Sequence, residues 1–106
     1  MGSDSRIKLH QVEVEPQKSM EIVDALKVKQ YYNTQKKRNS IGFIAQEAEE
    51  LVPEAVKIHD LTEVGLQSDH RMLEYRRLFV HTFGAIQYLE SEIQSLMERL
   101  EALQSA

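Results

Sequence analysis

The C-terminal quarter of the chain carries the most regular pattern of apolar residues. Between Leu78 and Leu103 they recur at alternating spacings of three and four. One series comprises Phe79, Ile86, Ile93 and Leu100, and the other comprises Leu89, Leu96 and Leu103. A stripe this narrow, at heptad positions a and d, is typical of a coiled-coil seam. With Phe79 at position a, Thr82 falls at position d, so the predicted seam is clean from Ile86 onward and weaker before it.

This predicted helix is long for so short a chain. At 1.5 Å per residue, residues 78–103 would span on the order of 40 Å, so the helix should project and associate with other copies. Gly84 is the one helix-breaking residue, at outward position f, where it costs about 1 kcal/mol unless another layer packs closely there. The alternative is a lone amphipathic helix lying on its own domain. Ile at position a with Leu at position d favours a dimer.

Shorter patterns fill the preceding residues. Ile7 to Val14 alternates imperfectly, which predicts a short strand or an extended arm broken near His10. Pro16 can begin a helix with an apolar stripe. That stripe comprises Met20, Ile22, Val23 and Leu26. Residues 27–33, the polar loop from Thr34 to Ser40 and the apolar run from Ile41 to Ala45 together predict a strand, a loop and a second strand.

The remaining segments complete a small mixed domain. Gln46 to Val52 is prone to helix formation, and Pro53 should end that helix. Ala55 to His59 predicts a strand, and Asp60 to His70 predicts a loop or a protruding hairpin. The expected fold class is therefore α+β, a single domain over residues 1–106. It has a head of short strands and helices (1–77) and a coiled-coil helix (78–104).

Composition and charge add further constraints. The chain has 106 residues, a net charge of -4 and no cysteine, and its pI is near 5.5. The acidic balance argues against a nucleic-acid partner, and the one basic run, Lys36-Lys37-Arg38, is interpreted as a solvated loop. A head this small supplies little core, so association is expected. Apolar runs never approach 18 residues and no signal peptide is apparent, which predicts no membrane partner. Met1-Gly2 is interpreted as the start of a fragment whose own sequence begins at Ser3.

Metal, cofactor and aromatic-cage sites have little support. The histidines are scattered, with no two at metal spacing; they are His10, His59, His70 and His81. Glu47 and Glu50 share a helical face, interpreted as a solvated acidic face rather than an acid–base pair. No phosphate-binding glycine motif is present. The aromatic residues Tyr31, Tyr32, Phe43 and Phe79 are expected in the core. We therefore expect no cofactor and no metal.

The start of the chain offers one catalytic possibility. A serine becomes a nucleophile when a base takes its proton, and a lysine can be that base when burial or nearby positive charge favours its neutral form. Ser3 and Lys8 are of these types, with Arg6 as the nearby charge. In an extended chain they would lie about 16 Å apart. A working pair therefore needs a sharp local turn or a Lys8 from a neighbouring protomer. The alternative is that Ser3 or Asp4 merely caps a helix.

Three ordered blocks of sequence accompany this pair. The first is Ser3-Asp4, Arg6 and Lys8. The second runs from Gly42 to Glu47 as Gly-Phe-Ile-Ala-Gln-Glu, and continues with Glu49, Glu50 and Pro53. The third is Tyr75, Leu78 and residues 85–89. This set resembles the C-terminal intramolecular chaperone and self-cleaving domain of phage tail spikes, tail fibres and neck appendages. The chain departs from that family at Glu74, usually an aspartate, and Asp60 to His70 matches no motif.

The resemblance implies a function. Such a domain forms a homotrimer at the end of a fibrous precursor, aligns the β-helical or fibrous shaft upstream, and then severs the bond before Ser3. Ser3 would be the nucleophile and Lys8 its base, with Asp4 and Arg6 positioning them and tuning charge. The protein would be a virion protein precursor that acts in the host cytoplasm during assembly and is released after cleavage. The alternatives are a trimerisation cap that does not cut, or the same domain in a membrane-tethered transcription factor.

Overall fold

The computed structural model describes residues 2–106, and its elements follow the predicted order. The helices are α1 (Pro16–Ala25), α2 (Ala45–Leu51) and α3 (Tyr75–Ser105), and the strands are β1 (Lys29–Asn33), β2 (Arg38–Gly42), β3 (Val56–His59) and β4 (His70–Leu73). Short 3₁₀ turns occur at Ser5–Ile7, Pro53–Ala55 and Thr62–Val64. The fold is mixed α and β with short strands and one long C-terminal helix, as the sequence predicts.

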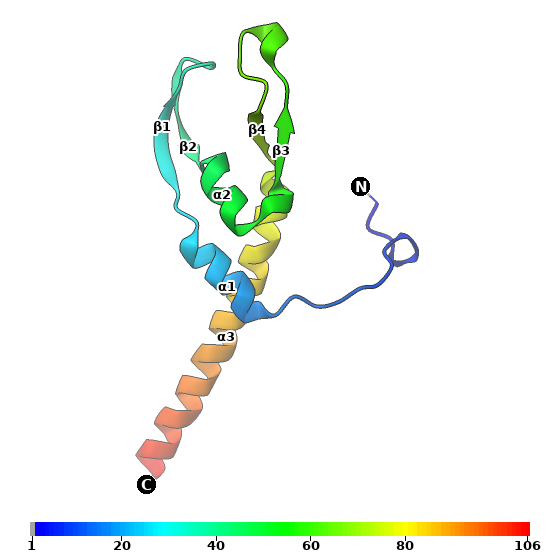
Figure 1. Cartoon of the computed structure of the whole chain (residues 1–106). Helices are drawn as coiled ribbons and strands as arrows, with labels where there is room; N and C mark the ends of the chain where they lie inside the picture. The colour runs from blue at the N-terminus through cyan, green and yellow to red at the C-terminus, as the bar shows by residue number, and fades with distance from the viewer. Residues whose placement is uncertain (1) are drawn as a thin grey trace.

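The molecule is strongly elongated. Its principal extents are 70 × 39 × 21 Å and its radius of gyration is 19.4 Å, against about 13 Å for a compact chain of this length. Two hairpins stand at one end, α3 projects from the other, and an N-terminal arm leaves the body sideways (Figure 1). The 31 residues of α3 span about 46 Å at 1.5 Å per residue.

Each hairpin is an antiparallel pair. β1 pairs with β2, placing Tyr31 opposite Ser40, and β3 pairs with β4, placing Val56 opposite Leu73. The hairpin interpretation of residues 60–70 is confirmed. The second strand, however, covers Arg38–Gly42 rather than the apolar run from Ile41 to Ala45. Pairing with β1 recruits its polar residues, and Ala45 already begins α2.

The core is small and lies where α1, α2 and the base of the hairpins meet α3. Its buried residues are Ile22, Ala48, Val52, Ala55 and Leu78, with Leu26, Phe43, Leu51 and Leu73 packed around them. The predicted stripe of α1 is therefore partly confirmed, since Ile22 is buried while Met20 and Val23 are half-buried. So few buried residues leave the head with little hydrophobic stabilisation of its own.

The helix α1 crosses α3 closely at Gly84. A Cβ at Gly84 would lie 2.6 Å from the Ser19 Oγ and 2.7 Å from its Cβ. Ser19 is 3% exposed, and its hydroxyl lies 3.0 Å from Nδ1 of His81 in a hydrogen bond. The close packing at position f that was expected to accompany a glycine is therefore present, and Ser19 of α1 provides it.

The helix α3 begins before the predicted Leu78. Glu74 precedes its first turn, where its backbone N–H donates to the Ala55 carbonyl at 2.7 Å. The Glu74 carboxylate pairs with Lys57 at 2.7 Å and with Arg77 at 2.6 Å. The Lys57 hydrogen bond is the main cause that lowers the pKa of Glu74. These contacts tie the start of α3 to the second hairpin and extend the helix to Tyr75.

The predicted seam of α3 is uncovered by its own chain. Its residues are Ile86, Leu89, Ile93, Leu96, Leu100 and Leu103, with exposures from 45% at Leu89 to 75% at Leu103. The alternative of a helix lying on its own domain is therefore wrong for this stretch.

Two aromatic residues depart from expectation. Tyr32 is 57% exposed and Phe79 is 54% exposed, so placing them in the core was wrong. Tyr32 lies at an exposed position of β1, and Phe79 falls at seam position a. Tyr31 and Phe43 are half-buried, as their position beside the core requires.

Candidate active site

The N-terminal segment folds into a tight turn. Asp4 caps the 3₁₀ turn Ser5–Ile7 by accepting the backbone N–H of Arg6 at 2.9 Å. The N–H of Ile7 donates to the Asp4 carbonyl and that of Lys8 to the Ser5 carbonyl, both at 3.1 Å. This turn bends the chain back within a few residues, so the segment is not extended here.

The turn brings Ser3 and Lys8 together within one chain. The Lys8 Nζ lies 3.2 Å from the Ser3 Oγ and donates a hydrogen bond to it. This is inside the reach of 2.6–3.2 Å that a nucleophile and its base require. Of the two arrangements that the sequence left open, the sharp local turn is the one observed. A lysine from a neighbouring protomer is not needed to make this contact.

Asp4 and Arg6 lock the turn as a bidentate pair. The Arg6 Nε lies 3.0 Å from Oδ1 of Asp4, and a terminal guanidinium nitrogen lies 2.7 Å from Oδ2. The Arg6 side chain is the main cause that lowers the pKa of Asp4, and Asp4 raises the pKa of Arg6. An exposed ion pair contributes little by itself. The capping and backbone hydrogen bonds therefore dominate the local order, and much of the Arg6 charge is engaged by Asp4.

The bond before Ser3 lies against the same turn. A Cβ built on Gly2 would come within 2.9 Å of the Ile7 Cδ1, so residue 2 packs on the Ile7 side chain. Ser3 and Lys8 are both exposed. Ser3, Lys8 and the peptide bond before Ser3 are thus close together on the surface of the arm.

The arm beyond the turn is extended rather than a strand. His10 has a positive φ of 54°, which confirms the predicted break, and the chain then runs to Pro16 without strand pairing among the described residues. Its apolar side chains face solvent: Ile7, Leu9, Val12 and Val14 are between 56% and 86% exposed. The arm therefore presents apolar surface that its own chain leaves uncovered.

The second and third sequence blocks meet in space, although they are far apart in the chain. The backbone N–H of Phe43 donates to the Tyr75 hydroxyl at 3.2 Å. The Phe43, Tyr75 and Phe79 rings form a ladder with centroids 5.8 Å apart at each step. A Cβ at Gly42 would lie 2.5 Å from the Tyr75 hydroxyl. The absence of a side chain at Gly42 thus leaves room for the Tyr75 hydroxyl. The contacts of Tyr75 with Phe43 connect the first hairpin to α3.

Sequence reasoning missed the contact between Ser19 and His81. His81 was treated as one of four scattered histidines, yet it binds the one buried polar side chain among residues 2–106. Gly84, three residues further along α3, was the available signal. A glycine inside a long helix indicates a close neighbour, although the sequence alone could not say which.

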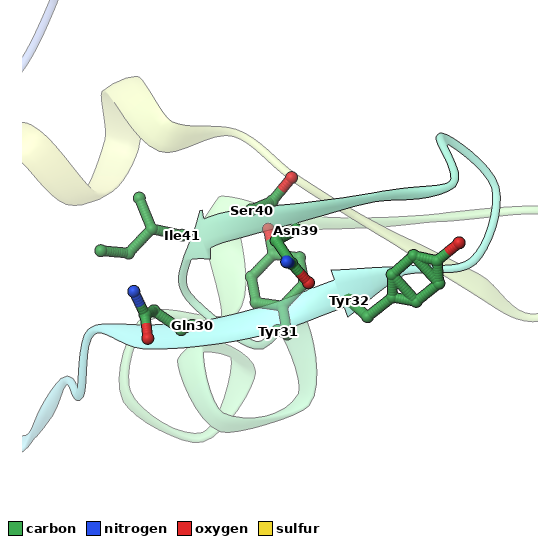
Figure 2. A pocket seen from close by; sticks show the side chains of 6 residues that line it. All are labelled: Gln30, Tyr31, Tyr32, Asn39, Ser40 and Ile41. Carbon is green, nitrogen blue, oxygen red and sulfur yellow. The ribbon is translucent and has the colours of Figure 1, made fainter.

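A hollow of the described surface lies on the first hairpin. It measures about 600 Å³ and is lined by Gln30, Tyr31, Tyr32, Asn39, Ser40 and Ile41 (Figure 2). No carboxylate, lysine or histidine lies among these lining residues, so no acid–base pair is available there. The turn at the N-terminus, by contrast, places an amine (Lys8) against a hydroxyl (Ser3).

Two of the three acidic residues of α2 form ion pairs. Glu47 pairs with Lys29, and Glu49 accepts from Arg71 at 3.0 Å. Within residues 2–106, no three His, Asp or Glu side chains are grouped to hold a metal ion. Across the same residues, no helix combines the length and apolar character needed to cross a membrane.

Comparison with known families gives one match. Residues 3–57 match the model of a peptidase family described as "Chaperone of endosialidase". The matched segment begins at Ser3 and covers the N-terminal turn, α1, the first hairpin, α2 and the start of β3. A comparison with curated proteins finds no match.

Proposed function

Because the chain belongs to the peptidase family described as the chaperone of endosialidase, we propose that it aligns an upstream fibrous phage protein as a homotrimer and then cuts itself free before Ser3. Membership makes the chain a chaperone-type domain of the kind found at the C-termini of phage tail proteins. The trimer, the self-cleavage and the residues that perform it are the proposal.

The contact between Ser3 and Lys8 is the observation that carries the proposal. Five residues separate them in sequence, yet the Lys8 Nζ and the Ser3 Oγ are 3.2 Å apart. The family match begins at Ser3 itself. A cut before Ser3 requires a nucleophile and a base in contact. Ser3, the first residue of the matched segment, would be that nucleophile, and Lys8 would be the base.

The proposed reaction is an acyl shift followed by hydrolysis. Lys8, as the neutral amine, takes the Ser3 hydroxyl proton while the Ser3 Oγ attacks the carbonyl carbon of residue 2. The C–N bond then breaks, and the Ser3 nitrogen takes up the proton as an amine. Residue 2 is left as an ester on the Ser3 Oγ. Water opens this ester, which yields a carboxylate on residue 2 and restores the hydroxyl.

Assembly would act as the trigger. Burial disfavours an ammonium ion relative to the neutral amine, and the Lys8 side chain is exposed in the single chain. Covering the arm, in the trimer or against the folded shaft, would supply that burial. The apolar side chains of the arm give a reason for it to be covered. Cleavage would then wait until the substrate has been aligned.

Trimerisation supplies the chaperone action. The exposed seam of α3 is suited to pairing with other copies, which would hold three precursor chains side by side. Non-local pairing of a fibrous shaft is slow because loop closure must precede the contacts that stabilise it. A trimer of this domain would align the three chains and so remove the need to find the correct register. Hydrolysis makes the release irreversible and leaves the shaft kinetically trapped.

A longer precursor tests the cut directly. Ser3→Ala and Lys8→Ala should each give trimers that fold but stay full length, while the unchanged precursor yields a new N-terminus at Ser3. Lys36→Ala, in the β1–β2 turn, is the matched control and should cut normally. Cutting at the same bond in the Ser3→Ala protein would show that the assigned nucleophile is wrong.

The two other candidate functions give different outcomes in that experiment. A trimerisation cap without peptidase activity would leave the unchanged precursor whole. The same domain in a membrane-tethered transcription factor would cut, but behind a DNA-binding region rather than a fibrous shaft. For the phage protein we propose cleavage in the host cytoplasm during assembly, followed by release of this domain.

A further inference from the structure

An apolar groove at the junction of the head and α3 adjoins the exposed seam. It measures about 190 Å³ and is lined by Val23, Leu26, Val28, Phe43, Leu78, Phe79 and Thr82. Phe79 and Thr82 are the a and d positions that immediately precede the clean part of the seam, and Leu78 is at position g. The groove is therefore continuous with the face that is proposed to pack against other copies.

Contacts of α3 show which flank of the seam is already occupied. Ser19 of α1 lies against His81 and Gly84, at positions c and f. Leu78 and Ala85, both at position g, are 1% and 3% exposed. The helix α1 thus covers the c, f and g side at this level and forms one wall of the groove. Positions a, b, d and e remain open.

Phe83 is the exposed aromatic residue at position e of this heptad. Its side chain is 70% exposed. In parallel coiled coils, position g of one helix lies beside position e of the following heptad of its neighbour, because these positions flank the core. Leu78 at position g is therefore matched with Phe83 of a second copy. The later e positions carry Glu90, Met97 and Gln104, none of them aromatic.

We propose that Phe83 of one copy inserts into this groove of the next, so that the interface extends from the coiled coil onto the head. Size supports the fit, because an apolar cavity of about 150 Å³ accommodates benzene. The ladder of Phe43, Tyr75 and Phe79 holds one wall in place. The occupant is thus a second copy of this chain. The inference rests on the proposed self-association with parallel helices.

Disulfide formation between single-cysteine variants tests this contact cleanly, because the chain has no cysteine of its own. Val28→Cys and Phe83→Cys chains, one carrying a size tag, are co-expressed and oxidised. A disulfide-linked pair of mixed size is expected on a non-reducing gel. The matched control replaces Phe83→Cys by Val80→Cys, which is 62% exposed but lies at outward position b. That pair should stay unlinked.

A third variant separates failure of this inference from failure of the proposed function. Ile93→Cys lies at seam position a and should link to its own copy in any parallel, in-register assembly. If it links while the Val28 and Phe83 pair does not, or if the Val80 control links equally well, insertion of Phe83 is overturned and self-association stands. If Ile93→Cys also stays unlinked, the parallel assembly itself is wrong.

Discussion

Gly42 lies close to two tyrosine hydroxyl groups. A Cβ added at Gly42 would lie 2.5 Å from the hydroxyl oxygen of Tyr75 and 3.2 Å from the hydroxyl oxygen of Tyr31. We expect Gly42→Ala to lower the free energy of unfolding by about 1–3 kcal/mol, as overpacking does. Thermal or urea unfolding measures this loss.

A second substitution identifies the cause. Tyr75→Phe removes the closest oxygen and forfeits the hydrogen bond from Phe43, at about 1 kcal/mol. Combined with Gly42→Ala it should cost clearly less than the sum of the two single changes, because the clash and the hydroxyl disappear together. Strict additivity would mean that Tyr75 is not what excludes a side chain at position 42.

Gly84 gives a prediction in which packing opposes helix propensity. From helix propensity alone, Gly84→Ala should stabilise α3 by about 1 kcal/mol. The added Cβ would, however, lie 2.6 and 2.7 Å from atoms of Ser19, and this overpacking should lower the free energy of unfolding by about 1–3 kcal/mol. We expect the second result, measured as a lower unfolding midpoint. Ser91→Ala is the control at the next f position, which is exposed, and should be neutral or slightly stabilising. A gain at Gly84 would refute the close crossing of α1 and α3.

At the scale of elements, the N-terminal turn depends on the Asp4 carboxylate. Asp4→Ala removes both the cap and the partner of Arg6, so Ser3 and Lys8 should separate and self-cleavage of a precursor should slow by about tenfold or more. Asp4→Asn keeps a capping oxygen and loses the charge, so it should cut faster than Asp4→Ala. Time courses on gels measure both. Equal rates in all three proteins would show that the turn does not position the pair.

The same carboxylate makes the turn sensitive to acid. Hydrogen bonding to Arg6 lowers the pKa of Asp4, so the folded turn favours the charged form. Its contribution is therefore fully present above the ordinary carboxyl pKa of about 4 and is lost as pH falls through the lowered value. The amide chemical shift of Arg6, followed by NMR, should move in that acid range. A pH-independent shift would contradict the cap, and Asp4→Asn provides the control.

Sequence patterns predicted most elements because local physics fixes them. Proline at position 16 begins α1, proline at position 53 ends α2, and the heptads of α3 form a continuous helix. The extent of β2 was not predictable, because its polar residues become a strand only by pairing with β1. A sharp turn between Ser3 and Lys8 was one of two arrangements that the sequence left open, and the turn at Ser5–Ile7 could not be placed, because its hydrogen bonds come from one short polar segment without periodicity. The exposure of Phe79 follows from its place in the seam, which the described part of its own chain leaves uncovered.

At the scale of the whole molecule, few buried residues and a long exposed seam predict that the stability of the chain depends on association with its copies. The apolar side chains of the seam remain roughly half exposed or more, and their burial on association would be the main free-energy gain available. Because unfolding is then coupled to dissociation, the unfolding midpoint should rise with protein concentration. Differential scanning fluorimetry across a hundredfold dilution series measures this. A midpoint that stays constant would indicate a monomer.

A charge placed in the seam should separate the copies without harming the head. Leu96→Asp puts a carboxylate at position d, where association would bury it unpaired, and that cost should shift the protein to a monomer by sedimentation. Ser95→Asp, one residue away at outward position c, adds the same charge and should leave the assembly intact. In a precursor, Leu96→Asp should also reduce self-cleavage although Ser3 and Lys8 are unchanged, because burial of the arm is proposed to follow assembly. If the monomeric variant cuts as fast as the Ser95→Asp protein, cleavage does not wait for association, and the trigger lies within the single chain.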